Sequence, residues 1–298
     1  MKTVNTLTIN LKNSMLIALF IIVSAFSVNA QQKQTTHMEN LTTSGYAPVN
    51  GLKMYYEIYG SGTMPLVLIH GGGSTIESSF GNILPLLSTY GKVIAVELQA
   101  HGRTSDRDAP ESFEQDADDV AALLKYLKID KANFLGFSNG GTTTLQIAIR
   151  HSDIVNKIVV ISANYRRDGM MPGFFEGFPN ATIANMPDVL KEAYLKVAPD
   201  KSHLQIMFEK DVARMANFKD IPDEDMRSIK APALVMSADH DVVIPEHMVK
   251  MSHILANARL SILPGLHGSV IGALESGAKK GDKLQGITAT LVEEFLNE

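Results

Sequence analysis

The stretch Gly136-Phe137-Ser138-Asn139-Gly140 decides the fold prediction for this chain. It lies between an apolar run over 132–137 and a helix-compatible run over 142–150. A serine at a strand-to-helix turn, with a glycine two positions away on each side, can hold strained backbone angles. Its hydroxyl is then exposed at the carboxyl edge of a sheet. The following helix would point its free N–H groups at that serine. The context therefore predicts a nucleophile that becomes briefly anionic.

Other apolar runs predict the strands that surround this turn. The predicted strands are 52–59, 66–69, 93–96, 134–137, 158–161, 234–236 and 260–263. Short, wholly apolar runs are typical of parallel strands that are buried on both faces. The sequence Ser112-Phe113-Glu114-Gln115 resembles a capping box ahead of a helix that reaches Leu127, and 285–296 forms a final amphipathic helix. Alternating strands and helices predict an α/β fold with a mostly parallel, doubly wound sheet.

The segment between Ser162 and Ile229 breaks this alternation, because it has short helical patches and no clear strand. It predicts a helical cap at about 163–229, inserted between two strands and arching over the open edge of the sheet. We expect this substrate-binding set to line the pocket: Gly73, Met170, Met171 and Phe174. Part of the apolar cluster at the start of the cap would instead hold the cap onto the body, while flexible methionine walls adapt to varied apolar ligands.

The first thirty residues predict a secretory signal peptide. Lys2 and Lys12 precede an apolar run over 15–28, which ends at Val28-Asn29-Ala30. That run is shorter than the roughly 20 residues that a membrane-spanning helix needs. We therefore expect cleavage near Ala30 and export to the periplasm or the medium. Residues 31–48 are predicted to be a disordered leader, and 49–298 the folded domain.

Charge and composition narrow the classes of partner. Removal of 1–30 takes away two lysines and no acid, which leaves 25 basic and 32 acidic residues and a formal net charge of −7. Such a balance argues against nucleic acid and an anionic membrane surface as partners, so a small-molecule substrate is expected. The absence of cysteine from the sequence excludes disulfides, thiolate metal sites, a cysteine nucleophile and a lipid attached to an N-terminal cysteine. The sequence does not predict an oligomeric state.

Four segments that carry polar groups follow predicted strands. They are Ser138 itself, His70-Gly71-Gly72-Gly73, the stretch 237–241 (Ser-Ala-Asp-His-Asp) and the stretch 264–268 (Pro-Gly-Leu-His-Gly). In an open parallel sheet such groups gather beyond the carboxyl ends of the strands. Together they supply a hydroxyl, backbone donors, a carboxylate and an imidazole.

With these segments in place, the chain resembles an α/β-hydrolase over nearly all of 50–298, of the capped, serine esterase or lipase-like kind. The family has its nucleophile, acid and histidine in that chain order, which here implies Ser138, Asp241 and His267. The acid precedes Pro245 by four residues, and the histidine follows a Pro-Gly turn. The resemblance to lipase-like esterases in 71–73 is weaker, because their cap usually precedes this glycine run.

The resemblance implies a role for each residue. His267 would take the proton of Ser138 as it attacks a carbonyl, and Asp241 would orient and stabilise the imidazole. The amides of Asn139 and Gly72 would form the oxyanion hole, with Gly73 as an alternative to Gly72. Asp239 is an alternative to Asp241 as the acid; otherwise it would brace its loop.

Several other chemistries are disfavoured. The glycines at 71–73 lack the pattern of a P-loop or a dinucleotide site. Asp239, His240, Asp241 and His247 are too close in one stretch to converge readily on a metal ion, so neither a metal nor another cofactor is predicted. His70 and His101 are expected to bond loop backbone. A serine at 138 argues against dehalogenases and epoxide hydrolases of this fold, which use an aspartate.

The resulting prediction is an exported serine hydrolase that cleaves carboxylic ester-type bonds of small apolar substrates through an acyl-enzyme. The alternatives on the same triad are a lactonase, a C–C bond hydrolase or a perhydrolase. A ligand-binding sensor with slow turnover is the alternative from another class.

Overall fold

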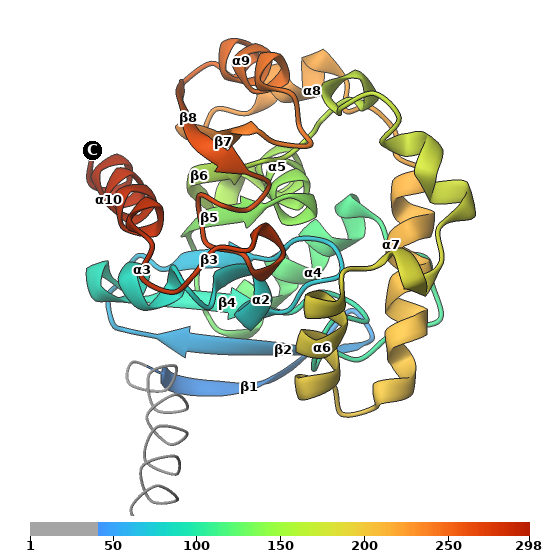
Figure 1. Ribbon diagram of the computed structural model, residues 1–298. Helices are drawn as coiled ribbons and strands as arrows, with labels where there is room; N and C mark the ends of the chain where they lie inside the picture. Colours follow the sequence, from blue (N-terminus) through green and yellow to red (C-terminus); the bar gives the residue numbers. More distant parts are fainter. Residues whose placement is uncertain (1–40) are drawn as a thin grey trace, which may run out of the picture. The chain divides into compact units, whose positions relative to one another are not determined.

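The computed structural model of the protein describes residues 41–298 (Figure 1). The predicted signal peptide at 1–30 and the first ten residues of the predicted leader lie outside the described residues. In the described part of the chain, no helix is both long and apolar enough to cross a membrane.

An eight-stranded sheet forms the centre of the described domain. The strands are β1 (Leu41–Val49), β2 (Leu52–Tyr59), β3 (Leu66–Ile69), β4 (Val93–Val96), β5 (Ala132–Phe137), β6 (Val155–Ile161), β7 (Ala233–His240) and β8 (Ala258–Leu266). Their order is β1-β2-β4-β3-β5-β6-β7-β8. The pairs β1–β2 and β2–β4 are antiparallel and the others parallel, so the predicted mostly parallel sheet is confirmed.

The order of the strands reverses beside β3. The chain passes from β3 to β4 on one side and then returns to place β5 on the other side, with Ile69 paired to Gly136. Every residue of β3, β4 and β5 is buried, as short apolar runs predict for parallel strands covered on both faces. A reversal of this kind leaves a crevice beyond the carboxyl ends of the strands. The segments after β3 and β5 therefore meet there.

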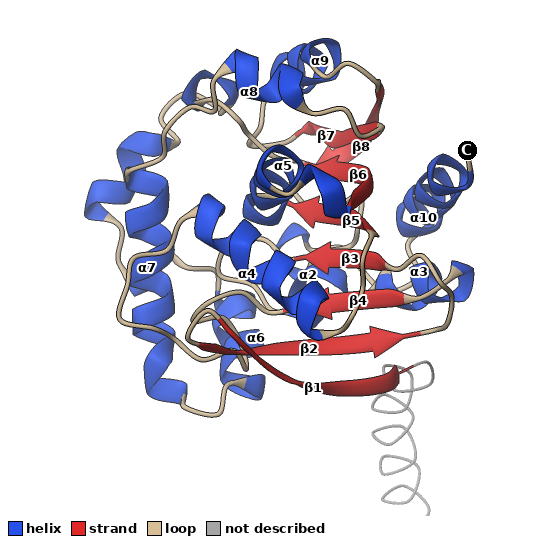
Figure 2. Cartoon of the chain, turned by 180° about the vertical axis from the view of Figure 1, so that it is seen from behind, coloured by secondary structure: helices blue, strands red, loops and turns tan. Residues whose placement is uncertain are grey.

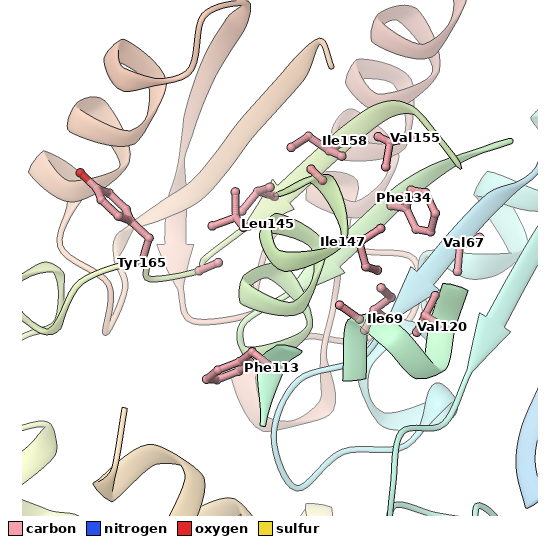
Figure 3. Close-up of a cluster of buried hydrophobic side chains, with 14 of the residues drawn as sticks. Val67, Ile69, Phe113, Val120, Phe134, Leu145, Ile147, Val155, Ile158 and Tyr165 are labelled. Carbon is pink, nitrogen blue, oxygen red and sulfur yellow. The ribbon is translucent and has the colours of Figure 1, made fainter. Parts of the chain in front are cut away.

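Helices cover both faces of the sheet. Outside the cap they are α2 (Ile76–Phe80), α3 (Leu84–Tyr90), α4 (Phe113–Tyr126), α5 (Asn139–Arg150), α9 (Pro245–Ile254) and α10 (Lys283–Asn297), with the short turns η1 (Ser152–Ile154) and η6 (Leu274–Ser276). One buried cluster joins α4, α5 and α9 to the face of the sheet seen in Figure 2, and a second joins α2, α3 and α10 to the other face. Figure 3 shows the first cluster, in which Val120 and Ile147 lie against Ile69 and Phe134.

The start of α4 forms only part of the predicted capping box. Ser112 caps the helix and accepts a hydrogen bond from the amide of Gln115 at 3.1 Å. The predicted reciprocal half of the capping box is replaced, because the Gln115 amide group donates to Asp119 at 3.0 Å. The Asp119 carboxylate is buried and also pairs with Arg107. It therefore engages the Gln115 side chain in place of the Ser112 backbone amide.

The predicted leader at 31–48 is wrong for residues 41–48, which belong to strand β1. β1 pairs with β2 through a two-residue turn at Asn50-Gly51, where both residues have positive φ, 46° and 85°. This is the Asn-Gly hairpin signal, and it was available in the sequence. The side chains of Ala47 and Val49 are buried on the core side of the hairpin.

The helical cap inserted between β6 and β7 is confirmed. It contains η2 (Arg167–Gly169), η3 (Phe175–Asn180), η4 (Ile183–Asn185), α6 (Asp188–Val197), η5 (Lys201–His203), α7 (Leu204–Ala216) and α8 (Asp223–Ser228). Figures 1 and 2 show α6 and α7 beyond the end toward which the parallel strands point. Met186, Leu190, Tyr194, Ala198 and Met207 of the cap bury a small cluster against Ala100 of the body.

Candidate active site

Ser138 lies at a sharp turn between β5 and α5, with φ 54° and ψ −122°. The two flanking glycines make this turn possible. A Cβ on Gly136 would lie 2.0 Å from the carbonyl oxygen of Gly140, and a Cβ on Gly140 would lie 2.1 Å from that of Ile69. Real atoms cannot approach so closely, so both positions require glycine. The turn leaves Ser138 partly exposed while its neighbours are buried.

Three side chains that are far apart in the sequence meet at this turn. The Nε2 atom of His267 lies 3.1 Å from the Oγ of Ser138, and its Nδ1 lies 2.7 Å from Oδ1 of Asp241. Asp241 follows β7 and His267 follows β8, so the carboxyl ends of three strands supply the group. The His267 ring also lies against Phe137, with the ring centroids 4.8 Å apart.

The Asp241 carboxylate is buried and well supplied with donors. Besides His267, it accepts hydrogen bonds from the Ser162 hydroxyl at 2.5 Å and from the amide of Val243 at 3.1 Å. Burial alone would raise the pKa of Asp241, but His267 and these hydrogen bonds outweigh burial and lower it. The carboxylate therefore stays ionised and can hold His267 with Nδ1 protonated.

The structure distinguishes Asp241 from Asp239, the two residues that the sequence allowed as the acid. Asp239 does not bond His267 but accepts a hydrogen bond from the amide of Gly265 at 2.8 Å, which braces the turn before the histidine. Asp241 has the contact with the imidazole. His247 lies apart from both and stacks on Tyr165, with ring centroids 4.6 Å apart. Among residues 41–298, no group of three or more His, Asp or Glu side chains is arranged to hold a metal ion.

Gly72 and Asn139 lie side by side next to Ser138. Asn139 is the first residue of α5, so its amide has no partner within the helix. A Cβ on Gly72 would lie 2.5 Å from Nδ2 of Asn139, which shows how closely the two residues approach. Two amides at this position can converge on the same oxygen of a bound acyl group.

The amide of Gly73 already has a hydrogen-bond partner. Its amide donates to Oδ2 of Asp211, a residue of α7 in the cap, at 2.5 Å. Of the two glycines considered as oxyanion donors, Gly73 is thus committed to the cap. Its φ of 65° and the Met186 methyl, which would lie 3.2 Å from an added Cβ, also favour glycine here.

The rings of His70 and His101 lie against each other at a tilt of 44°, with centroids 4.8 Å apart, but they differ in protonation. Nδ1 of His70 faces the carbonyl of Gly71, and its Nε2 accepts from the amide of Leu98, which requires a neutral ring. Burial and the neighbouring His101 lower the pKa of His70 to about 3. The predicted bond to loop backbone is present.

His101, in contrast, has an acceptor at both ring nitrogens. Its Nδ1 lies 2.7 Å from the carbonyl oxygen of Gln99 and its Nε2 lies 3.0 Å from Oδ2 of Asp211. Both nitrogens must therefore donate, which requires the imidazolium form. Burial would lower the pKa of His101, but the Asp211 carboxylate outweighs this effect and raises it to about 9.

The three cap residues predicted to contact substrate lie away from the loop after β3 that carries Gly72 and Gly73, called the oxyanion loop below. Met170 forms a bridge with Val243, and the amide of Met171 donates to the carbonyl of Val242 at 2.8 Å. Phe174 packs against Phe175 and Phe178 at the body. The apolar cap side chains that an added Cβ on Gly73 would meet are those of Met186 and Leu190. These two residues, with Ser162, Asp211 and Arg214, are site neighbours that the sequence analysis missed, and none has a recognisable motif.

Comparisons with known proteins agree on the fold of this chain. The family model described as alpha/beta hydrolase fold matches residues 64–196. The chain is 28% identical over 235 residues to the serine hydrolase BPHL of Homo sapiens, covering 74% of this chain and 79% of that protein. It is 22% identical over 236 residues to a 2-hydroxy-6-oxo-6-(2'-aminophenyl)hexa-2,4-dienoic acid hydrolase of Metapseudomonas resinovorans, covering 72% and 79% respectively.

The crystal structure of an enol-lactonase from Burkholderia xenovorans has the same fold, with a TM-score of 0.65 and 24% identity. The match covers 85% of this chain and all of that one. The family model, the relatives and the matched structure all indicate the same fold. The chain therefore has the α/β hydrolase fold.

Proposed function

We propose that this α/β hydrolase is a serine hydrolase that cleaves carboxylic ester-type bonds of small, fairly apolar substrates. One observation carries the proposal: the hydrogen-bonded series from Ser138 through His267 to Asp241, with distances of 3.1 and 2.7 Å. A serine hydroxyl is a weak nucleophile at neutral pH, and a neighbouring imidazole that can accept its proton removes this limit.

The reaction proceeds in two halves. Ser138 attacks the carbonyl carbon of the ester as its proton passes to Nε2 of His267. The tetrahedral intermediate collapses, the C–O bond to the alcohol breaks, and His267 returns the proton to the leaving oxygen. Water, deprotonated by His267, then attacks the acyl carbon, and Ser138 leaves with that proton. The products are one acid and one alcohol, and Asp241 stays ionised throughout.

The amides of Asn139 and Gly72 stabilise the negative oxygen in both tetrahedral intermediates. The positions of the two residues support this assignment. Asn139 begins α5, Gly72 lies against the Asn139 side chain, and the Gly73 amide is already bonded to Asp211. Loss of one such donor typically lowers kcat by about 10² to 10³.

The preference for apolar substrates rests on two apolar cap side chains beside Gly73, those of Met186 and Leu190. We also assign substrate contact to Gly73, Met170, Met171 and Phe174. Gly73 lies in the loop after β3, and Met170 and Met171 contact the loop after β7 through Val243 and Val242. The names of the similar proteins include a lactonase and a dienoic acid hydrolase, so lactones and C–C substrates belong in the same screen.

We further propose that the protein acts outside the cytoplasm after cleavage near Ala30. The support is the order of basic residues, apolar run and small residues in 1–30. Expression of the full chain in a bacterial host tests this. A mature protein that begins at Gln31 and is recovered from the periplasm or medium is expected, and an intact N-terminus retained in the cytoplasm would contradict export.

Substitution of Ser138 by alanine tests the catalytic proposal. Hydrolysis of short acyl esters should fall by at least about 10³-fold, and a fluorophosphonate probe should label the wild type, but not the variant, at Ser138. Ser228→Ala is the matched control, because this exposed hydroxyl donates only to the carbonyl of Asp225. An unlabelled wild type that binds ligands tightly would favour a sensor instead.

A further inference from the structure

We propose that Asp211, on cap helix α7, is a positioning residue that holds the oxyanion loop in place. This inference rests on the proposed function for its catalytic consequence, but its structural part concerns the loop itself. Asp211 and Gly73 are 138 residues apart in the chain, and their contact joins the cap to the loop that follows β3.

The contact fixes a whole peptide unit. The carbonyl of Gly72 and the amide of Gly73 belong to one planar group, so a bond to the Gly73 N–H also sets the direction of the Gly72 carbonyl. That carbonyl accepts a hydrogen bond from the Ser74 hydroxyl at 3.3 Å. With both ends of the peptide bonded, rotation of this unit is restricted, and the Gly72 Cα that joins it to the peptide carrying the Gly72 amide is held in place.

The same carboxylate also borders Gly72 directly. An added Cβ on Gly72 would lie 3.4 Å from Oδ2 of Asp211 and 2.5 Å from the side-chain Nδ2 of Asn139. The backbone at Gly72 is therefore enclosed between the cap carboxylate and the helix that begins beside Ser138. Movement of Asp211 would open this enclosure.

Two cations hold the Asp211 carboxylate in turn. Oδ2 accepts from the His101 imidazolium at 3.0 Å, and Oδ1 pairs with the Arg214 guanidinium one turn along the same helix. Arg214 is held by Asp116 of α4 at 2.8 Å. Each oxygen of Asp211 thus has a strong, buried partner, which makes the carboxylate a rigid support for the Gly73 amide.

This arrangement gives the cap a part in the chemistry besides enclosing substrate. A cap that shifts away from the body would release the Gly73 amide and loosen the donor at Gly72, while leaving the contacts among Ser138, His267 and Asp241 intact. The expected signature is a loss of acylation rate with little change in substrate binding.

The test compares three variants of the full chain. Asp211→Asn keeps the shape but removes the charge and one acceptor. Asp116→Asn disturbs the same buried network without touching Gly73, and Glu209→Gln changes an exposed carboxylate on the same helix that is bonded only to Gln205. We measure kcat and KM with short acyl esters, the rate of fluorophosphonate labelling, the melting temperature, and amide hydrogen exchange at Gly73.

For Asp211→Asn we expect kcat and the labelling rate to fall roughly 10- to 100-fold with KM changed less than about threefold. Exchange at Gly73 should be faster by a similar factor. Asp116→Asn should lower the melting temperature but keep kcat within about threefold, and Glu209→Gln should match the wild type.

Two results would overturn the proposal. One is an Asp211→Asn variant with wild-type kcat and unchanged exchange at Gly73; the other is an equal loss of kcat in Asp116→Asn, which would indicate a general packing role. If the wild type neither hydrolyses esters nor is labelled at Ser138, the proposed function fails. The exchange comparison still decides whether Asp211 holds the loop.

Discussion

The two sides of Ser138 are held in place by different parts of the molecule. On the acid side, all hydrogen-bond partners of the Asp241 carboxylate come from the sheet body: His267, Ser162 and the amide of Val243. On the oxyanion side, the amide of Gly73 is held by Asp211 of the cap. Proton transfer can thus be built from strand ends alone, whereas stabilisation of the oxyanion depends on how the cap is seated.

The largest effect should come from the acid side. Asp241→Asn should lower kcat by about 10⁴-fold, because an amide can favour the wrong tautomer of His267. Asp239→Asn is the matched control, since Asp239 bonds the Gly265 amide and not the imidazole, and should lose less than about tenfold. Steady-state kinetics with one acyl ester measures both. Equal losses in the two variants would contradict the assignment of Asp241.

A smaller effect is expected on the oxyanion side. In Gly72→Ala the new methyl group would lie 2.5 Å from Nδ2 of Asn139, so the loop or the Asn139 side chain must move. We expect kcat to fall roughly 10- to 100-fold with little change in KM, because an amide donor is displaced. Gly177→Ala, at a cap position with open space around it, serves as the control. Wild-type kcat in Gly72→Ala would argue against Gly72 as a donor.

The weakest effect concerns stability and pH. The pKa of His101 in the folded protein, about 9, lies above the 6.5 of an unperturbed histidine. Its pairing with Asp211 therefore stabilises the fold fully below pH 6.5, and this contribution is lost as the pH rises through 9. The shift corresponds to on the order of 3 kcal/mol in the free energy of unfolding.

Urea unfolding of the wild type and Asp211→Asn at pH 7 and pH 10 measures this contribution. The difference in unfolding free energy between the two proteins should shrink at pH 10, where His101 in the wild type is neutral. Lysines and tyrosines that titrate in the same range act on both proteins and largely cancel. A difference that stays constant with pH would show that His101 is not the titrating partner.

Most of the sheet and the acid side could be predicted because their signals are local. A short apolar run marks a parallel strand buried on both faces, and the polar residue after it must lie at the carboxyl edge. Ser138 follows such a run in β5, and Asp241 and His267 follow β7 and the partly exposed edge strand β8. The Asn50-Gly51 hairpin was equally local, yet the polar residues around it obscured the strand over 41–49.

The cap contacts could not be predicted in this way. Asp211 lies in α7 among other charged residues, and nothing in the sequence shows which side of that helix meets the loop after β3. The aromatic cluster at the start of the cap predicts substrate contact for Phe174, but it does not predict that this side chain packs against Phe175 and Phe178. Contacts of this kind depend on how a helix is seated, which hydrophobic periodicity does not specify.

The position of the cap between two neighbouring strands has a consequence for engineering. Ile161 near its start pairs with Met236 in β7, so the whole segment leaves and re-enters the sheet at adjacent strands and is suited to exchange as a single block. A transplanted cap that has no carboxylate at the position of Asp211 would leave the buried His101 without its counter-ion. Chimeras made to alter substrate range should therefore carry this one acid across with the donor helix.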